Sequence, residues 1–176
     1  MKLGKVLRRF LVPAPIVTLY YLSKYGCKIS LKAEVELSPF LTIGKNTVIS
    51  SFTKVKASDG SLKIGANVSI ATGCFISSYD KGLEIGDDCM VGPNTCIIAN
   101  NYRYDKIDVP IQEQGAISKK GVKIANNVWI GANCCILDGA DIGSGVIISP
   151  NSVVSSKIPS NTIVMGNPAK VIFKRR

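Results

Sequence analysis

The chain has 176 residues and 46% hydrophobic content, enough apolar material for one domain with a continuous core, which excludes a disordered protein. Its 22 lysines and arginines exceed its 12 aspartates and glutamates by ten, which favours an anionic partner such as a phosphorylated cofactor, a nucleic acid or an anionic membrane surface. The chain contains no histidine, so the side chain that most often carries protons near neutral pH is absent from it.

The first 26 residues, "MKLGKVLRRFLVPAPIVTLYYLSKYG", combine a basic start with an apolar middle. Two prolines interrupt them and no small-x-small cleavage site follows, so we expect neither a secretory signal nor a membrane-spanning helix. Apolar residues within 2–11 fall on one helical face, with basic residues around them. We expect a short helix there that caps the domain, within an N-terminal segment 1–26. Peripheral contact of this basic segment with an anionic membrane is the alternative interpretation.

From residue 43 onward, large aliphatic residues recur at every sixth position within five groups. They are Ile43, Ile49 and Val55; Ile64, Ile70 and Ile76; Ile85, Val91 and Ile97; and Ile124, Ile130, Ile136, Ile142, Ile148 and Val154, the last six spanning two groups. The residue four places later is small wherever the repeat continues, as at Thr47, Cys74, Cys89 and Cys134. The pattern predicts a second, tighter inward position and assigns these cysteines to the core rather than to redox or metal chemistry.

The groups start at residues 43, 64, 85, 124 and 142, so they are separated by 21, 21, 39 and 18 residues. A step of 18 is three hexapeptides, one triangular coil. The steps of 21 add three residues in "ASDG" and "SYDKG", which are turn-forming sequences. The step of 39 is one coil of 18 residues plus 21 more, and the additional residues form an insertion at about residues 101–121. The pattern predicts an all-β parallel β-helix with three short strands per coil and one extruded loop.

The hexapeptides, together with "IANNVWIGANCCILDGADIG", "SPNSVV", "KIPSNTIVMGNPAKVI" and "DVPIQEQG", resemble the left-handed β-helix acyltransferases. They are most similar to bacterial enzymes that acetylate sugars and surface polysaccharides. The resemblance covers residues 27–173, which we expect to form the β-helix domain, with 174–176 as a basic tail. It implies a left-handed helix and a homotrimer with sites between subunits. It also implies a cytoplasmic acetyl-CoA-dependent acetyltransferase that acts on a hydroxyl or amine of a sugar or polysaccharide precursor. A location at the inner face of the membrane is the alternative expectation.

The resemblance also implies where acetyl-CoA binds. Trp129 is expected to pack near the acceptor and the pantetheine end. Proline has no N–H, so Pro150 cannot supply the backbone hydrogen bond usual at its place in the family. Lys157 stands one position away from the family's usual lysine. The expected cofactor contacts are Gly131, Ala132, Ser149, Pro150, Ser155, Ser156, Lys157 and Lys170.

Asn100 occupies the position of the family's catalytic histidine, and an amide cannot act as a general base near neutral pH. Three interpretations remain open. In the first, another group takes the proton: Tyr102, Asp105, Asp108 or Glu113. In the second, the acceptor is an amine, already a nucleophile in its neutral form. In the third, the protein is a noncatalytic trimer that has lost its base.

Other classes with this fold are excluded by particular residues. The zinc site of the β-helix carbonic anhydrases requires histidines, so no metal is expected. The Thr-x-Thr ranks of ice-binding helices are absent. No nucleic acid is expected as a partner, because the chain has neither a basic recognition helix nor a pattern of aromatic residues on which bases stack. An acyltransferase and a noncatalytic trimer therefore remain.

Overall fold

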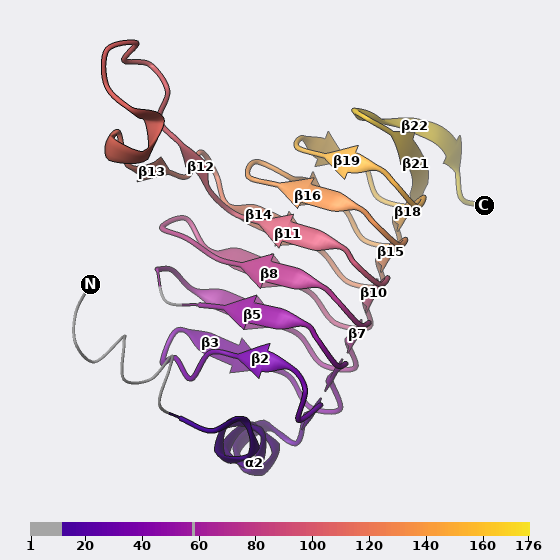
Figure 1. Ribbon diagram of the computed structural model, residues 1–176. Helices are drawn as coiled ribbons and strands as arrows, with labels where there is room; N and C mark the ends of the chain where they lie inside the picture. The colour runs from indigo at the N-terminus through magenta and orange to yellow at the C-terminus, as the bar shows by residue number, and fades with distance from the viewer. Residues whose placement is uncertain (1–11, 58) are drawn as a thin grey trace.

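The computed structural model describes residues 12–57 and 59–176, so the helix expected over residues 2–11 lies outside the described part. The chain winds into a triangular prism whose coils stack along one axis (Figure 1). Each coil contributes one strand to each of three sheets, and neighbouring coils pair in parallel. The predicted all-β left-handed β-helix is confirmed.

The three sheets form the sides of the prism. Sheet A has the order β1 (Lys28–Ile29), β4 (Val48–Ile49), β7 (Ser69–Ile70), β10 (Met90–Val91), β15 (Trp129–Ile130), β18 (Ile147–Ile148), β21 (Thr162–Gly166) and β22 (Ala169–Lys174). Sheet B has the order β2 (Glu34–Val35), β5 (Lys54–Lys56), β8 (Phe75–Ser77), β11 (Cys96–Ile98), β16 (Cys135–Leu137) and β19 (Val153–Val154). Sheet C has the order β3 (Leu41–Ile43), β6 (Leu62–Ile64), β9 (Leu83–Ile85), β14 (Val122–Ile124), β17 (Asp141–Ile142) and β20 (Lys157–Ile158).

The hexapeptide register is confirmed, because every aliphatic residue of the repeat is buried inside the prism. The small inward residues are buried too, and those with a hydroxyl or thiol connect adjacent coils through hydrogen bonds. Thr53 Oγ1 donates to the Ala71 carbonyl at 2.7 Å, and Thr95 Oγ1 donates to the Gly131 carbonyl at 2.9 Å. Cys89 Sγ donates to the Ala125 carbonyl at 3.2 Å. Small size alone therefore does not explain this position, since a hydroxyl or thiol also satisfies a corner carbonyl of the next coil.

The corners of the prism place one residue of a hexapeptide in the left-handed backbone region, where asparagine and aspartate are tolerated. Asn46, Asn67 and Asp88 have φ of 61°, 57° and 57° in successive coils. Asn46 Nδ2 donates to Asn67 Oδ1 at 3.2 Å, and Asn67 Nδ2 donates to Asp88 Oδ1 at 3.0 Å. Phe52, at φ 63°, is the bulky exception and is 69% exposed.

The helix α2 (Ala14–Tyr25) covers the first coil, at the end of the prism away from the extruded loop (Figure 1). Pro13 is its N-cap and Pro15 lies in the first turn, where a missing N–H costs nothing. Tyr21, on the face of α2 that packs against the prism, is buried, and its hydroxyl donates to the Glu36 carbonyl at 2.9 Å. Burial raises the pKa of Tyr21 to about 12. Among the described residues, no helix has the length and apolarity to span a bilayer.

At the opposite end of the prism the chain reverses direction. Strand β22 pairs antiparallel with β21 and ends at Lys174, one residue beyond the expected limit of the β-helix domain. Arg175 continues the contacts, because its Nη1 donates to the Gly145 carbonyl at 2.7 Å. Most of the segment expected to be a basic tail is therefore joined to the last coils.

Candidate active site

The expected insertion leaves the prism at the corner between sheets B and C. After β11 and the buried Ala99, strand β12 (Asn101–Tyr102) runs outward, and β13 (Ala116–Ile117) returns antiparallel to it. Figure 1 shows this two-stranded ribbon projecting from the prism between β11 and β14, with the rest of the loop beyond it. The extruded loop is confirmed, and its position in the register agrees with the predicted residues 101–121.

A buried aspartate that the sequence analysis did not single out anchors the returning side of the loop. Asp138, only 5% exposed, follows β16 one coil above the loop. Its carboxylate accepts hydrogen bonds from the amides of Lys119, Lys120 (3.1 Å) and Gly121 (2.8 Å). Ser118 Oγ lies 3.3 Å from Asp138 Oδ1 and donates to the Ala99 carbonyl at 2.8 Å. These contacts fix the base of the loop on the prism.

The outer part of the loop is braced by Gln114. Its Nε2 donates to the carbonyls of Lys106 and Val109, both at 2.7 Å, and its Oε1 accepts from the Lys106 amide at 3.0 Å. A short 3₁₀ helix, η1 (Ile111–Glu113), precedes it. The final glutamine of "DVPIQEQG", Gln114, therefore has a structural role in holding the loop together.

Asn100 lies at the corner where the loop begins and is half-buried. Within the described part of the chain, no hydrogen-bond partner contacts its amide, so both ends of the side chain are open to a substrate. A hollow of about 480 Å³ lies at the same corner below the ribbon, and Asn100 is not one of its lining residues. The hollow is lined by Asp59, Tyr79 and Asp80 of lower coils and by Arg103 and residues 116–118 of the ribbon. Tyr79 holds the position of Asn100 in the coil below, because Ser77 pairs with Ile98.

The residues proposed as substitutes for histidine all lie on the outer loop or ribbon. Tyr102 is 55% exposed, and Asp105, Asp108 and Glu113 are exposed as well. Asp105 and Glu113 line a second, smaller hollow within the loop, together with Arg103, Lys106 and Gln114. In the single chain, all four of these groups are exposed to solvent.

The first of the expected cofactor residues lie on sheet A and at the corner between sheets A and B. Trp129 on β15 points outward and is 50% exposed, between Met90 and Ile147 of the adjacent coils. Gly131 follows, and a Cβ atom there would lie 2.6 Å from the Pro150 nitrogen, so only glycine allows the coils this close approach.

The backbone donors at this corner differ in their availability. The amides of Gly131 and Ser149 donate to Ile148 and Val164 of the next coils, at 2.8 and 2.9 Å. Pro150 has no N–H. Among the described residues, the Ala132 amide has no partner, so it is the free backbone donor of the expected pantetheine track.

The remaining expected contacts lie elsewhere. Ser155 and Ser156 are exposed at the corner between sheets B and C, two coils above Asn100, and Lys157 begins β20 on sheet C. Lys170 lies in β22 beside Met165. The structure therefore brings Ala132, Ser149 and Pro150 together at the corner between sheets A and B, with Trp129 beside them on sheet A. This corner forms one edge of sheet B. The structure places Asn100, the loop, Ser155 and Ser156 on the other edge.

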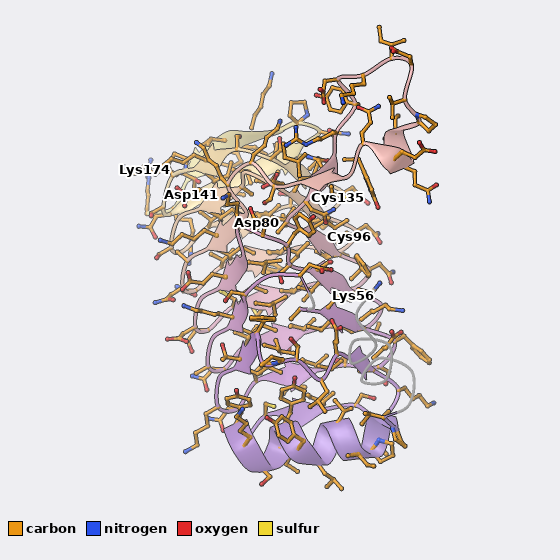
Figure 2. The ribbon with its side chains drawn as sticks, turned by 90° about the vertical axis from the view of Figure 1, so that its left-hand side faces the viewer. Lys56, Asp80, Cys96, Cys135, Asp141 and Lys174 are labelled. Atoms are coloured by element: carbon orange, nitrogen blue, oxygen red, sulfur yellow. The ribbon has the colours of Figure 1, made fainter. Side chains whose placement is uncertain are left out.

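Two half-buried thiols lie between these edges. Cys96 and Cys135 are in register on the outer surface of sheet B, one above the other (Figure 2). Burial, and then the neighbouring Cys135, raises the pKa of Cys96. Its thiol therefore stays protonated near neutral pH, which argues against a covalently acylated cysteine.

Comparison with known proteins agrees with this geometry. Residues 121–156 match the model described as bacterial transferase hexapeptide (six repeats). A probable acetyltransferase of Mycobacterium tuberculosis is 32% identical over 97% of this chain, which spans 56% of that relative's length. A putative lipopolysaccharide biosynthesis O-acetyl transferase of Escherichia coli is 33% identical over 74% of this chain and 80% of the relative.

Among solved structures, an N-acyltransferase from Bacillus cereus in complex with dTDP and 3-hydroxybutyryl-CoA superposes with a TM-score of 0.75. The two are 25% identical, and the match covers 86% of this chain and 81% of that one. The fold and the extruded loop thus define a left-handed β-helix protein of the acyltransferase class. The chain belongs to the bacterial transferase hexapeptide family.

Proposed function

We propose that the protein is an acetyl-CoA-dependent acetyltransferase that acts on a hydroxyl or amine of a sugar in a surface-polysaccharide precursor. The observation that carries the proposal is the pair of complementary edges on sheet B. One edge offers Trp129 and the free Ala132 amide to an extended thioester. The other offers Asn100 and the hollow under the loop to an acceptor. The E. coli relative carries the name of an O-acetyl transferase, and the B. cereus enzyme binds an acyl-CoA, which supports this assignment.

The two edges also support a homotrimer with its sites between subunits. Within one chain, sheet B separates the Trp129 edge from the Asn100 edge, so one chain cannot present both to the same thioester. If the Trp129 edge of one protomer packs against the Asn100 edge of the next, both edges face the same thioester. Repeating this contact around a threefold axis closes the assembly.

In the proposed reaction the acceptor atom attacks the thioester carbonyl and the thiol of CoA leaves. The Ala132 amide orients the pantetheine arm, and Trp129 provides an apolar wall beside the thioester. Asn100 donates from its amide to the acceptor or to the carbonyl oxygen. A neutral amine attacks first and loses its proton afterwards to water or to the leaving thiolate. A hydroxyl requires a base in the same step, which Asn100 does not supply.

The experiment incubates catalytic amounts of the protein with acetyl-CoA and a panel of hydroxyl and amino sugars, and measures release of CoA thiol. Substoichiometric protein keeps its own six cysteines out of the signal. Thiol release that depends on one acceptor and is lost in Trp129→Ala supports the proposal. Absence of any acetyl-CoA binding contradicts it.

The same experiment tests the second candidate, a noncatalytic trimeric scaffold, which Asn100 favours. Intact acetyl-CoA binding without turnover on any acceptor would support this candidate. Isothermal titration with acetyl-CoA separates the two outcomes, because binding is measured without reference to the acceptor.

A further inference from the structure

The helix α2 has two apolar faces, and the prism covers only one of them. Val17 and Tyr21 are buried against the first coil. Ile16 and Leu19, on the opposite face, are 56% and 64% exposed, and Tyr20 and Leu22 beside them are 41% and 45% exposed. Leu31, which lines the hollow next to α2, is 62% exposed. A helix that is apolar all round normally has a second apolar environment.

Among the described residues, the excess of positive charge is greater at this same end. The described residues 12–57 carry six lysines and two glutamates, whereas residues 59–176 carry twelve basic and ten acidic residues. The described part of the first segment forms α2 and the strands β1 to β5, the coils nearest the helix. The two glutamates are already engaged: Glu34 pairs with Lys54, and Glu36 Oε2 accepts from the Ala57 amide at 3.0 Å. Charge and exposed apolar surface therefore coincide at one end of the prism.

We infer that the α2 end of the prism docks on an anionic phospholipid surface. Ile16, Leu19 and their neighbours enter the boundary between headgroups and acyl chains, while lysines such as Lys24 and Lys28 contact lipid phosphates. Both ingredients are needed, because partial burial of a few apolar side chains gives only weak binding, to which each nearby basic residue adds. The contact is peripheral. It does not depend on the proposed acetyltransferase activity, since it uses none of the site residues.

The charge distribution favours a lipid surface over a second copy of the chain. Joining two α2 ends would bring two segments of net positive charge together, and like charges on opposing surfaces repel. A bilayer rich in anionic lipid instead neutralises them and accepts the apolar side chains.

The test is co-sedimentation of the full chain with vesicles of phosphatidylcholine alone, or of phosphatidylcholine with about 30% phosphatidylglycerol. The double variant Ile16→Ser/Leu19→Ser removes the apolar contact. The matched control is Phe173→Ser, an equally exposed apolar residue (64%) in β22 at the other end of the prism. All three substituted side chains are exposed, and circular dichroism melting checks that the variants are folded.

We expect the wild-type chain to bind the anionic vesicles, to bind neutral ones weakly, and to be released by high salt. The double variant should partition about tenfold less, and the control should bind like the wild type. Equal binding by the double variant and the wild type, or no binding by the wild type, overturns the inference. A lower oligomeric mass of the double variant in light scattering would also overturn it, because a second copy would then cover α2.

Discussion

At the scale of single residues, we expect Asn100 to decide which acceptors the protein can use. Its amide orients a substrate and takes no proton, which suits an amine better than a hydroxyl. We expect Asn100→His to raise acetylation of a hydroxyl acceptor roughly tenfold or more, because general bases contribute at least that much. The rate should rise with pH through about 6.5, since imidazole accepts a proton only when neutral.

Steady-state rates across pH check this prediction, with Asn100→Gln as the control that keeps an amide. An unchanged hydroxyl rate in Asn100→His, alongside normal acetyl-CoA affinity, would show that Asn100 does not face the acceptor.

Ala132 allows a single hydrogen-bond donor to be removed without disturbing the fold. Pro93 and Pro150 hold the equivalent place in the coils below and above, as the pairing of Trp129 with Met90 and Ile147 shows. Ala132→Pro should therefore fold normally while it loses the one free amide of the corner. We expect acetyl-CoA to bind about three- to tenfold more weakly, the value of one hydrogen bond. Isothermal titration measures the loss, and Ala132→Gly, which keeps the N–H, should retain wild-type affinity.

Phe52 holds the left-handed conformation at a cost that an asparagine would not incur. Asn94, Asn133 and Asn151 take the equivalent corner position in other coils, at φ of 57°, 55° and 60°. We expect Phe52→Asn to raise the free energy of unfolding by about 1 kcal/mol, because asparagine tolerates this conformation better. The loss of the contact between the ring and Lys32 reduces this gain. Denaturant unfolding checks the sign, and a loss of stability would mean that the ring packs against something more than solvent.

At the scale of elements, the loop depends on Asp138. The carboxylate accepts three backbone amides at the point where the loop rejoins the prism. We expect Asp138→Ala to cost about 2 kcal/mol, because three backbone N–H groups, that of Gly121 buried, lose a carboxylate acceptor. Hydrogen exchange should accelerate at residues 119–121, and the loop should become sensitive to protease. Asp141→Ala, an exposed aspartate on sheet C, is the control and should leave both unchanged.

The elements also show how far the sequence could predict the structure. The prism and the point of insertion follow from the six-residue period, because each inward position repeats in every coil. The ends of the prism follow no period, so α2 at Ala14–Tyr25 was read only as a proline-interrupted stretch. Asp138 and Gln114 were missed because their roles depend on backbone groups that only the folded loop brings to them. The sequence did contain one signal for Asp138: a charged residue stands there at a position that small residues hold in other coils, namely Ala57, Ser78 and Ala99.

For the molecule as a whole, the proposed site between two protomers can be tested by a mixing experiment. Trp129→Ala disables one edge and Asn100→Ala disables the other. If the site joins two chains, trimers assembled from a refolded equal mixture should recover about one quarter of wild-type activity, because that fraction of interfaces pairs two intact edges. Mixtures of chains that carry the complete site alone would recover nothing. Light scattering should give a mass three times 18.8 kDa.

Because the coils stack at a fixed spacing, the number of coils sets the distance between α2 and the proposed site. Four strand spacings, each about 4.8 Å, separate β1, which lies against α2, from β15, which carries Trp129. With α2 resting on a bilayer, Trp129 stands roughly 20 Å above β1, and the thickness of α2, about 10 Å, adds to its height above the bilayer. A threefold assembly would hold three such sites at equal height. An acceptor attached to lipid would then be modified on a sugar several units out from its anchor. Adding or deleting a coil below the loop would change which unit is reached.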